Sequence, residues 1–237
     1  MILRSVSSIR FMNLVDLTHS LTPDVPTWYG NCGFQSEVTK DYGNEKGVKF
    51  RTQRLAFEAG VGTHMDAPAH CVPGGLSIAD FPLDDLVAPC LMLDVSAIAD
   101  ETYKLTPQDI HDFEKQYGKI EAGVFVILYT GWSRFWHTPE AYRNNYRFPS
   151  ISKEAALQLL ERDVKGIGID TLSPDRPESG YPIHDLFLNA GKYIIENIAN
   201  AHLLPTKGSQ IIALPLKVAG ATEAPVRLIG LLPDTQQ

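Results

Sequence analysis

Cysteine is scarce in the 237-residue chain, which has three cysteines and no pair of them at CxxC spacing. A small, odd number of cysteines argues against a disulfide framework and indicates reduced thiols in a cytoplasmic protein. No apolar run approaches the roughly 20 residues of a membrane span, so no membrane segment is predicted. Positive charge is also in deficit, since the net charge is −7. This argues against a nucleic-acid surface, which needs clustered Lys and Arg.

Repeats, low-complexity tracts and linkers are absent as well, which predicts a single domain over residues 1–237. A hydrophobic fraction of 44% with 21% charged residues is typical of a soluble globular protein with a sizeable core. Residues 1–10 contain Arg and Ser without acids, faintly like an organelle presequence. The segment is too short to be a convincing one, and we interpret it as an ordinary disordered N-terminus.

The remaining pattern alternates strands and helices, which indicates an α/β fold with short strands around a half-barrel sheet. Apolar runs and alternation predict strands at residues 14–18, 50–58, 90–95, 124–129, 165–170, 211–216 and 226–232. The run at 124–129 is continuously apolar, so it is expected to be a central strand covered on both faces.

Two helices have clear start signals. Thr106 is a favoured N-cap and Pro107 suits the first helical position, while Gly118 can end that helix. Ser152 is expected to cap a second helix that runs to about Glu161. In that second helix the residues expected to face inward are Ala156, Leu157 and Leu160.

The stretch Gly60–His70 places two histidines and a carboxylate within seven residues. If it is extended, His64 and Asp66 project to the same face and can grip one ion, or Asp66 can bridge two. Pro68 cannot continue a central ladder, so the chain bends there and can bring His70 toward the ion without ligating it. The alternative is a pair of satisfied, partly buried histidines beside a turn.

His184 and Glu196 form a second cluster further along the chain. Glu196 follows the apolar run 193–195, which would carry it inside, and carboxylates are seldom buried unless they are paired or bind metal. His184 lies on what we interpret as a Gly/Pro loop, where a ligand can be positioned. Either residue alone is unremarkable, but together they are candidates for the other half of a metal site.

Aromatic residues near these clusters leave two interpretations open. Trp28, Trp132 and Trp136 are candidates to hold a flat aryl substrate by stacking, and core packing explains each of them equally well. His19 follows the first strand and could line the pocket, whereas His111 is expected on the surface of the first helix.

Residues 60–70 resemble the HxGTHxDxPxH signature of the cyclase-like metal-dependent hydrolases, a family that includes kynurenine formamidase (arylformamidase) and isatin hydrolase. The likeness extends along nearly the whole chain, including the first strand, the loop at 170–175 and the closing strands at 214–227. The resemblance implies an α/β, swivelling β/β/α fold and a homodimer or higher oligomer. It also implies a divalent metal, with zinc the first candidate and manganese the second, and hydrolysis of a carbon–nitrogen amide bond in a small molecule.

The resemblance also implies residue roles. By position, His64, Asp66, His184 and Glu196 would be metal ligands, with Asp66 bridging if two metals bind, and His70 would be the general acid/base. In kynurenine formamidase the substrate is N-formylkynurenine, which yields formate and kynurenine in tryptophan breakdown. A hydrolase of a cyclic amide or imide fits the same ligands. A binding protein on a weakened hydrolase scaffold is the alternative from a different class.

The main departure from the signature is Gly60, which stands where the family has its first histidine. Glycine has no side chain to ligate a metal. Glu58 shares the face of residue 60 on an extended strand but lies two residues back, so it would need a bulge to substitute. The other outcomes are a single-metal site on Asp66, His184 and Glu196, a site completed by water, or a weakened site.

Overall fold

The computed structural model describes residues 13–43, 47 and 49–233. The interpretation of residues 1–10 as a disordered N-terminus therefore lies outside the described residues. Among the described helices, none combines the length and the apolar character needed to cross a membrane.

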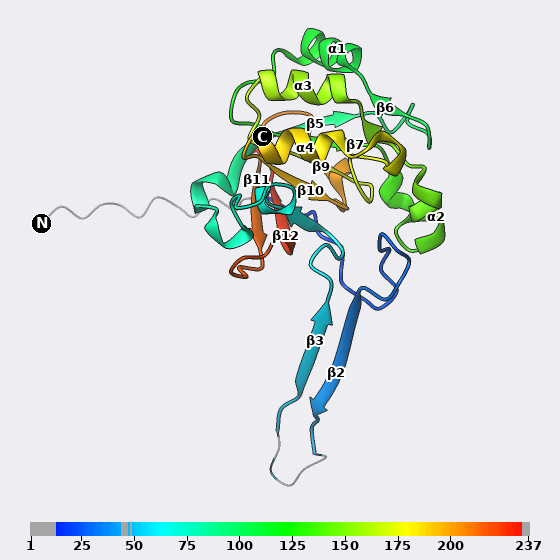
Figure 1. Cartoon of the computed structure of the whole chain (residues 1–237), viewed down its shortest axis with the longest axis vertical. Coiled ribbons are helices and arrows are strands. Elements are labelled where there is room, and N and C mark those ends of the chain that lie inside the picture. Colours follow the sequence, from blue (N-terminus) through cyan, green and yellow to red (C-terminus); the bar gives the residue numbers. More distant parts are fainter. Residues whose placement is uncertain (1–12, 44–46, 48, 234–237) are drawn as a thin grey trace, which may run out of the picture.

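A mixed eight-stranded sheet forms the body of the protein (Figure 1). Its strands, in spatial order, are β1 (Leu14–Asp16), β12 (Glu223–Leu231), β11 (Ser209–Pro215), β5 (Val87–Asp94), β7 (Phe125–Tyr129), β9 (Gly166–Ile169), β10 (Tyr193–Glu196) and β4 (His64–Asp66). Strands β5, β7, β9 and β10 are parallel. Strand β12 also pairs with β4, so the predicted half-barrel closes into a barrel-like sheet.

Three helices pack together on one side of this sheet, α1 (Pro107–Tyr117), α3 (Lys153–Glu161) and α4 (Pro182–Asn189) (Figure 1). The central strand β7 is covered on both faces, as predicted. Its Phe125 and Ile127 belong to one core cluster, inside the barrel, while Val126 and Leu128 belong to the cluster beneath the helices. The smaller elements are α2 (Pro139–Arg143) and the short pair β6 (Lys104–Leu105) and β8 (Ser150–Ile151).

Both predicted helix starts are confirmed. Thr106 and Asp109 form a capping box, Pro107 opens α1, and Gly118 follows its end at φ 87°. The Ser152 hydroxyl accepts a hydrogen bond from the Ala155 N–H at 3.1 Å. These caps satisfy backbone N–H groups that a helix start leaves without intrahelical partners.

The inward face predicted for α3 is partly wrong. Leu157 is 42% exposed, whereas Ala155, Ala156 and Leu159 are fully buried. Positions 155, 156 and 159 fall on one side of a 3.6-residue helix, and position 157 turns away from it. Leu160 is half-buried against the core.

Two further sequence predictions need correction. His184 lies on helix α4 and not on a loop, because Pro182 occupies the first helical position after Tyr181, whose φ is 58°. The predicted strand at 50–58 is present as β3 (Thr52–Phe57), but its partner β2 (Phe34–Lys40) was not predicted. The sequence of β2 carries few apolar residues, so it lacks the alternation that marks a half-buried strand.

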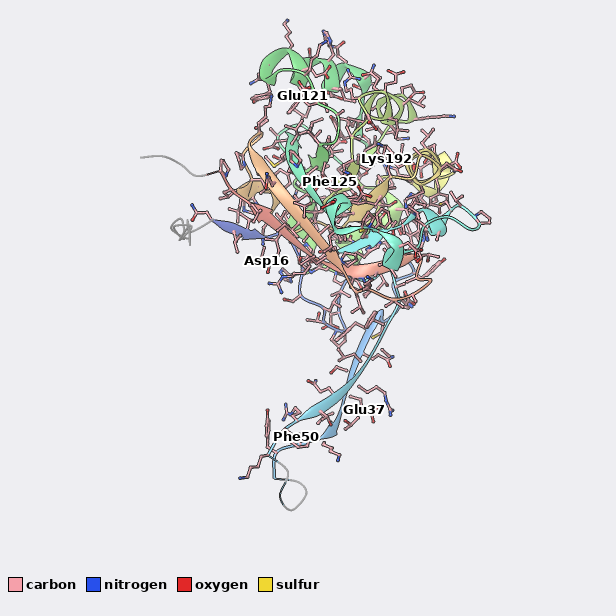
Figure 2. All side chains as sticks on the ribbon, turned by 90° about the vertical axis from the view of Figure 1, so that its left-hand side faces the viewer. Asp16, Glu37, Phe50, Glu121, Phe125 and Lys192 are labelled. Atoms are coloured by element: carbon pink, nitrogen blue, oxygen red, sulfur yellow. The ribbon has the colours of Figure 1, made fainter. Side chains whose placement is uncertain are left out.

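The β2–β3 hairpin projects as an arm from the body (Figure 1). Figure 2 shows Glu37 and Phe50 on this arm, well away from Phe125 in the core. Every residue of β3 is exposed, including Leu55 at 54%. A two-stranded ribbon with both faces in solvent has little to stabilise it within its own chain.

Candidate metal centre

The sheet brings the candidate ligands together through β4. His64 and Asp66 lie on one face of this strand, while Met65 between them is buried in the barrel core. Glu196 on β10 is buried, as the apolar run before it predicts, and it pairs in register with His64. The extended geometry expected for His64 and Asp66 is therefore present, and it places both side chains beside Glu196.

His184 reaches the same place from helix α4. Its Nδ1 donates to the Asp175 carboxylate at 2.8 Å, and Asp175 also accepts the backbone N–H groups of Ile183 and His184. The Nε2 atom then faces Glu196 Oε1 at 3.3 Å and Asp66 Oδ2 at 3.6 Å. A carboxylate on Nδ1 fixes the tautomer that leaves Nε2 free to ligate.

His64 is oriented in a similar way by the backbone. Its Nδ1 lies 2.9 Å from the Gly62 carbonyl oxygen, so Nε2 points to Glu196 Oε2 at 3.3 Å and Asp66 Oδ1 at 3.5 Å. Gly62 has φ 65°, a backbone conformation that favours glycine. Burial alone would lower the pKa of His64, but the carboxylates of Asp66 and Glu196 outweigh it and raise the pKa to about 10. The negative field that attracts a proton also attracts a metal cation.

The donor atoms fit a divalent metal. Two groups of side chains have their ligand atoms within 4.8 Å of one another, and Asp66 belongs to both: His64, Asp66 and Glu223, and Asp66, His184 and Glu196. Both Asp66 oxygens and Glu196 Oε1 are buried without a hydrogen-bond partner in the described chain. Buried carboxylates are costly without a partner, and a cation satisfies them. Imidazole and carboxylate ligands suit both zinc and manganese.

His70 ends the short turn Pro68–His70 that follows β4. Its Nδ1 faces Glu223 Oε2 at 3.4 Å, and its ring centre lies 5.8 Å from that of His184. Contact with Glu223 raises the pKa of His70 more than its partial burial lowers it. The bend at Pro68 thus brings His70 beside the ligand groups, but it belongs to neither of them.

Sequence reasoning did not find Asp175 or Glu223. Asp175 falls within the loop that resembles the family, but nothing in the sequence marks it as the partner of His184. Glu223 is distant from the signature in the chain, and only the pairing of β12 with β4 places it opposite Asp66. Long-range pairing of this kind leaves no local pattern to read.

The bulge that would bring Glu58 to the metal is not present. Strand β3 ends at Phe57, and a turn carries the chain through Gly60. Glu58 Oε1 instead accepts a hydrogen bond from Asn31 Nδ2 at 2.5 Å. Glu58 is a member of neither ligand group, although it lines the pocket above them.

A pocket of about 540 Å³ opens over the ligand groups. This volume is within the usual range for small-molecule sites. Trp28, Tyr29 and Tyr181 line it together with Leu172. Trp132 and Trp136 pack into a core cluster instead, and His19 stacks on Trp136 with ring centres 3.8 Å apart. Of the aromatic candidates only Trp28 thus lines the pocket, and His111 is exposed as predicted.

Comparison with known proteins agrees with this arrangement. The model of the Cyclase family, described as "Putative cyclase", matches residues 15–176. Since this match spans more than half of the chain, the protein belongs to the Cyclase family. The predicted family resemblance and the α/β cyclase-like fold are both confirmed.

Three relatives indicate the range of this similarity. Isatin hydrolase A from Ralstonia solanacearum has a solved structure with a TM-score of 0.84 and 30% identity, over 93% of this chain and 92% of that one. Kynurenine formamidase from Salinibacter ruber is 29% identical over 92% of this chain and 97% of its own. A potential metal-dependent hydrolase with cyclase activity matches with a TM-score of 0.74 and 28% identity, over 92% of this chain and 97% of that one.

Proposed function

We propose that this protein is a metal-dependent amidohydrolase that resembles kynurenine formamidase and cleaves N-formylkynurenine or a related aryl amide. The observation that carries the proposal is the meeting of two ligand groups at Asp66, at the floor of a pocket of about 540 Å³. Zinc is the first candidate for the metal and manganese the second. Two of the relatives described above are named kynurenine formamidase and isatin hydrolase, which supports a substrate of this class.

The proposed ligands are His64, Asp66, His184 and Glu196. When bound there, a divalent cation would supply Lewis acidity and would lower the pKa of water toward about 7. The protein holds these side chains ready through the Gly62 carbonyl and the Asp175 carboxylate, which orient His64 and His184.

His70 is the proposed general acid/base. Its Nδ1 faces the Glu223 carboxylate, so Nε2 is the nitrogen that can exchange protons with the substrate. In the proposed reaction Nε2 accepts the proton of the attacking water and delivers it to the leaving nitrogen as the carbon–nitrogen bond breaks. One group thereby serves as base and then as acid.

The pocket walls suit a flat substrate. Trp28, Tyr29 and Tyr181 offer aromatic surface, and the Trp28 and Tyr181 ring centres are 6.1 Å apart. Aromatic faces stabilise an aryl group by stacking and edge contacts. This composition supports an aryl amide over an aliphatic one.

A second candidate is the opening of a cyclic aryl amide. The fold match to isatin hydrolase A, at a TM-score of 0.84 over 93% of this chain, supports this candidate. Rates measured on N-formylkynurenine, isatin and formanilide separate the two candidates. A metal-loaded protein without turnover on any of the three would favour the alternative of a binding protein on a hydrolase scaffold.

The proposal also includes one domain over residues 1–237, a cytoplasmic location, and a homodimer or higher oligomer. Exposed apolar side chains on the hairpin, among them Val38, Leu55 and Phe57, support self-association. Light scattering coupled to size-exclusion chromatography tests the oligomeric state, and a mass equal to one chain would contradict it.

A further inference from the structure

We propose that Glu223 is a metal ligand and takes the place of the histidine that the family signature has at residue 60. This inference rests on the proposed metal-dependent function and adds one residue to its ligand set. A carboxylate on β12 would thereby ligate the metal in place of a side chain on the turn before β4. The vacancy left by Gly60 is filled from a distant part of the chain.

The strongest observation is that the Glu223 carboxylate lies where a side chain at residue 60 would be. A Cβ atom built on Gly60 would lie 2.5 Å from Glu223 Oε1 and 3.4 Å from His64 Nε2. The first distance is shorter than real side-chain contacts allow. The carboxylate therefore occupies the volume that a side chain at residue 60 would enter. The backbone at Gly60 has no positive φ, so a side chain there is opposed by the Glu223 carboxylate, the far end of a flexible side chain that would have to move aside.

Strand pairing holds Glu223 in this position. Glu223 lies opposite Asp66, and Pro225 lies opposite His64, in the antiparallel pairing of β12 with β4. Ala224 between them points into the barrel core. Glu223 thus projects to the ligand side of the sheet, and its carboxylate joins His64 and Asp66 in one ligand group.

The two oxygens of Glu223 have different neighbours. Oε2 faces His70 Nδ1 at 3.4 Å and accepts a hydrogen bond from the Thr222 hydroxyl at 3.4 Å. No hydrogen bond to Oε1 is found in the part of the chain that the structure describes. Oε1 is therefore available to a cation while Oε2 orients His70. The rival account, in which Glu223 only orients His70, gives Oε1 no role.

A glutamate at residue 223 in place of a histidine at residue 60 changes the donor atoms of the ligand group that contains His64 and Asp66. A histidine at residue 60 would give that group two imidazoles and one carboxylate, whereas Glu223 gives it one imidazole and two carboxylates. Carboxylate ligands suit manganese better than imidazole does, and imidazole suits zinc. We therefore expect the exchange to shift the relative affinity of this position from zinc toward manganese.

The first experiment compares Glu223→Ala and Glu223→Gln with wild type by elemental analysis and by calorimetric titration with Mn²⁺ or Zn²⁺ alone. Loss of a ligand is expected to weaken binding at one position by at least about tenfold, since even outer-shell changes cost 10–100-fold. Glu58→Ala is the matched control, because Glu58 lines the same pocket outside the ligand groups. It should keep wild-type metal content. Melting in EDTA verifies that each variant folds.

The second experiment restores the signature. Gly60→His alone should bring no gain, because the imidazole and the Glu223 carboxylate compete for one volume. The double variant Gly60→His with Glu223→Ala should bind metal at least about tenfold more tightly than Glu223→Ala alone. It should also favour zinc over manganese more strongly than wild type does. Such non-additivity is expected of two residues that share a site.

The outcomes separate this inference from the function on which it rests. Wild type that binds metal, with Glu223→Ala and Glu223→Gln binding it equally well, overturns the ligand role and leaves the proposed hydrolase intact. If the effects of Gly60→His and Glu223→Ala on metal affinity are additive, the proposal that Glu223 replaces the residue-60 histidine is also overturned. Wild type that binds neither Mn²⁺ nor Zn²⁺ overturns both proposals.

Discussion

Strand β4 is three residues long and fully buried, whereas the β2–β3 hairpin is longer and exposed along nearly its whole length. So short a strand is held in place by its neighbours β10 and β12, which pair with it on both sides. The hairpin strands pair only with each other. The candidate centre is thus positioned by pairing with strands on both sides, whereas the arm has little within the described chain to stabilise it.

The largest effect is expected from Asp66→Ala, because Asp66 belongs to both ligand groups. Metal affinity should fall by more than about 100-fold, and hydrolysis should fall below detection. Elemental analysis and steady-state rates give both readouts, and melting in EDTA verifies that the variant folds. Retention of a full metal complement would place the centre elsewhere.

His70→Ala should lower the rate of hydrolysis by about 10²–10⁴-fold, the usual contribution of a general acid/base. Metal content should not change, because His70 belongs to neither ligand group. Steady-state rates and elemental analysis on the same preparation check this. An unchanged rate would remove His70 from the mechanism.

Asp175→Asn tests the support of the centre from helix α4. Asp175 accepts the Nδ1–H of His184, and loss of such a partner typically costs 10–100-fold in metal affinity. The loss should therefore be smaller than for Asp66→Ala. Calorimetric titration with Mn²⁺ or Zn²⁺ measures it, and an equal or larger loss would contradict the ranking.

A histidine outside the centre gives a pH-dependent prediction. Burial, reinforced by His137, lowers the pKa of His19 from 6.5 to about 4. Above pH 6.5 the neutral His19 ring makes its full contribution to the free energy of unfolding. That contribution is lost as the pH falls toward 4, because the unfolded chain binds the proton more readily than the folded one. The loss is on the order of 2 kcal/mol.

His19→Phe keeps a ring to stack on Trp136 but cannot be protonated. Urea unfolding in EDTA between pH 7 and pH 4 should therefore show a shallower decline in stability than wild type. Parallel curves for the two proteins would show that His19 does not titrate as described.

The smallest effect on the centre is expected from the arm. Leu55→Glu places a charge on the exposed hairpin and should lower the apparent mass in light scattering from an oligomer to one chain. Metal content should not change, because the hairpin carries no member of either ligand group. A loss of metal in this variant would show that the hairpin influences the candidate metal centre.

The sequence predicted those candidate ligands that follow a local pattern. His64 and Asp66 share a face because alternate residues of a strand do, and the apolar run before Glu196 carries that carboxylate inside. The buried strand 124–129 and the caps Thr106 and Ser152 are local signals of the same kind, and all of them are confirmed.

Features that depend on distant parts of the chain were not predictable. Glu223 reaches the centre only because β12 pairs with β4, and Asp175 only because α4 begins beside it. Strand β2 has no apolar face of its own, so its polar sequence resembles a loop. Leu157 shows that residue spacing alone can misplace the buried face of a helix by one position.

If His64, Asp66, His184 and Glu196 hold a catalytic divalent metal, wild-type protein purified without chelator should contain it, and elemental analysis measures this. We expect about one or two equivalents of zinc or manganese per chain, since two ligand groups share Asp66. A chain that remains without metal after dialysis against Zn²⁺ or Mn²⁺ would contradict this expectation.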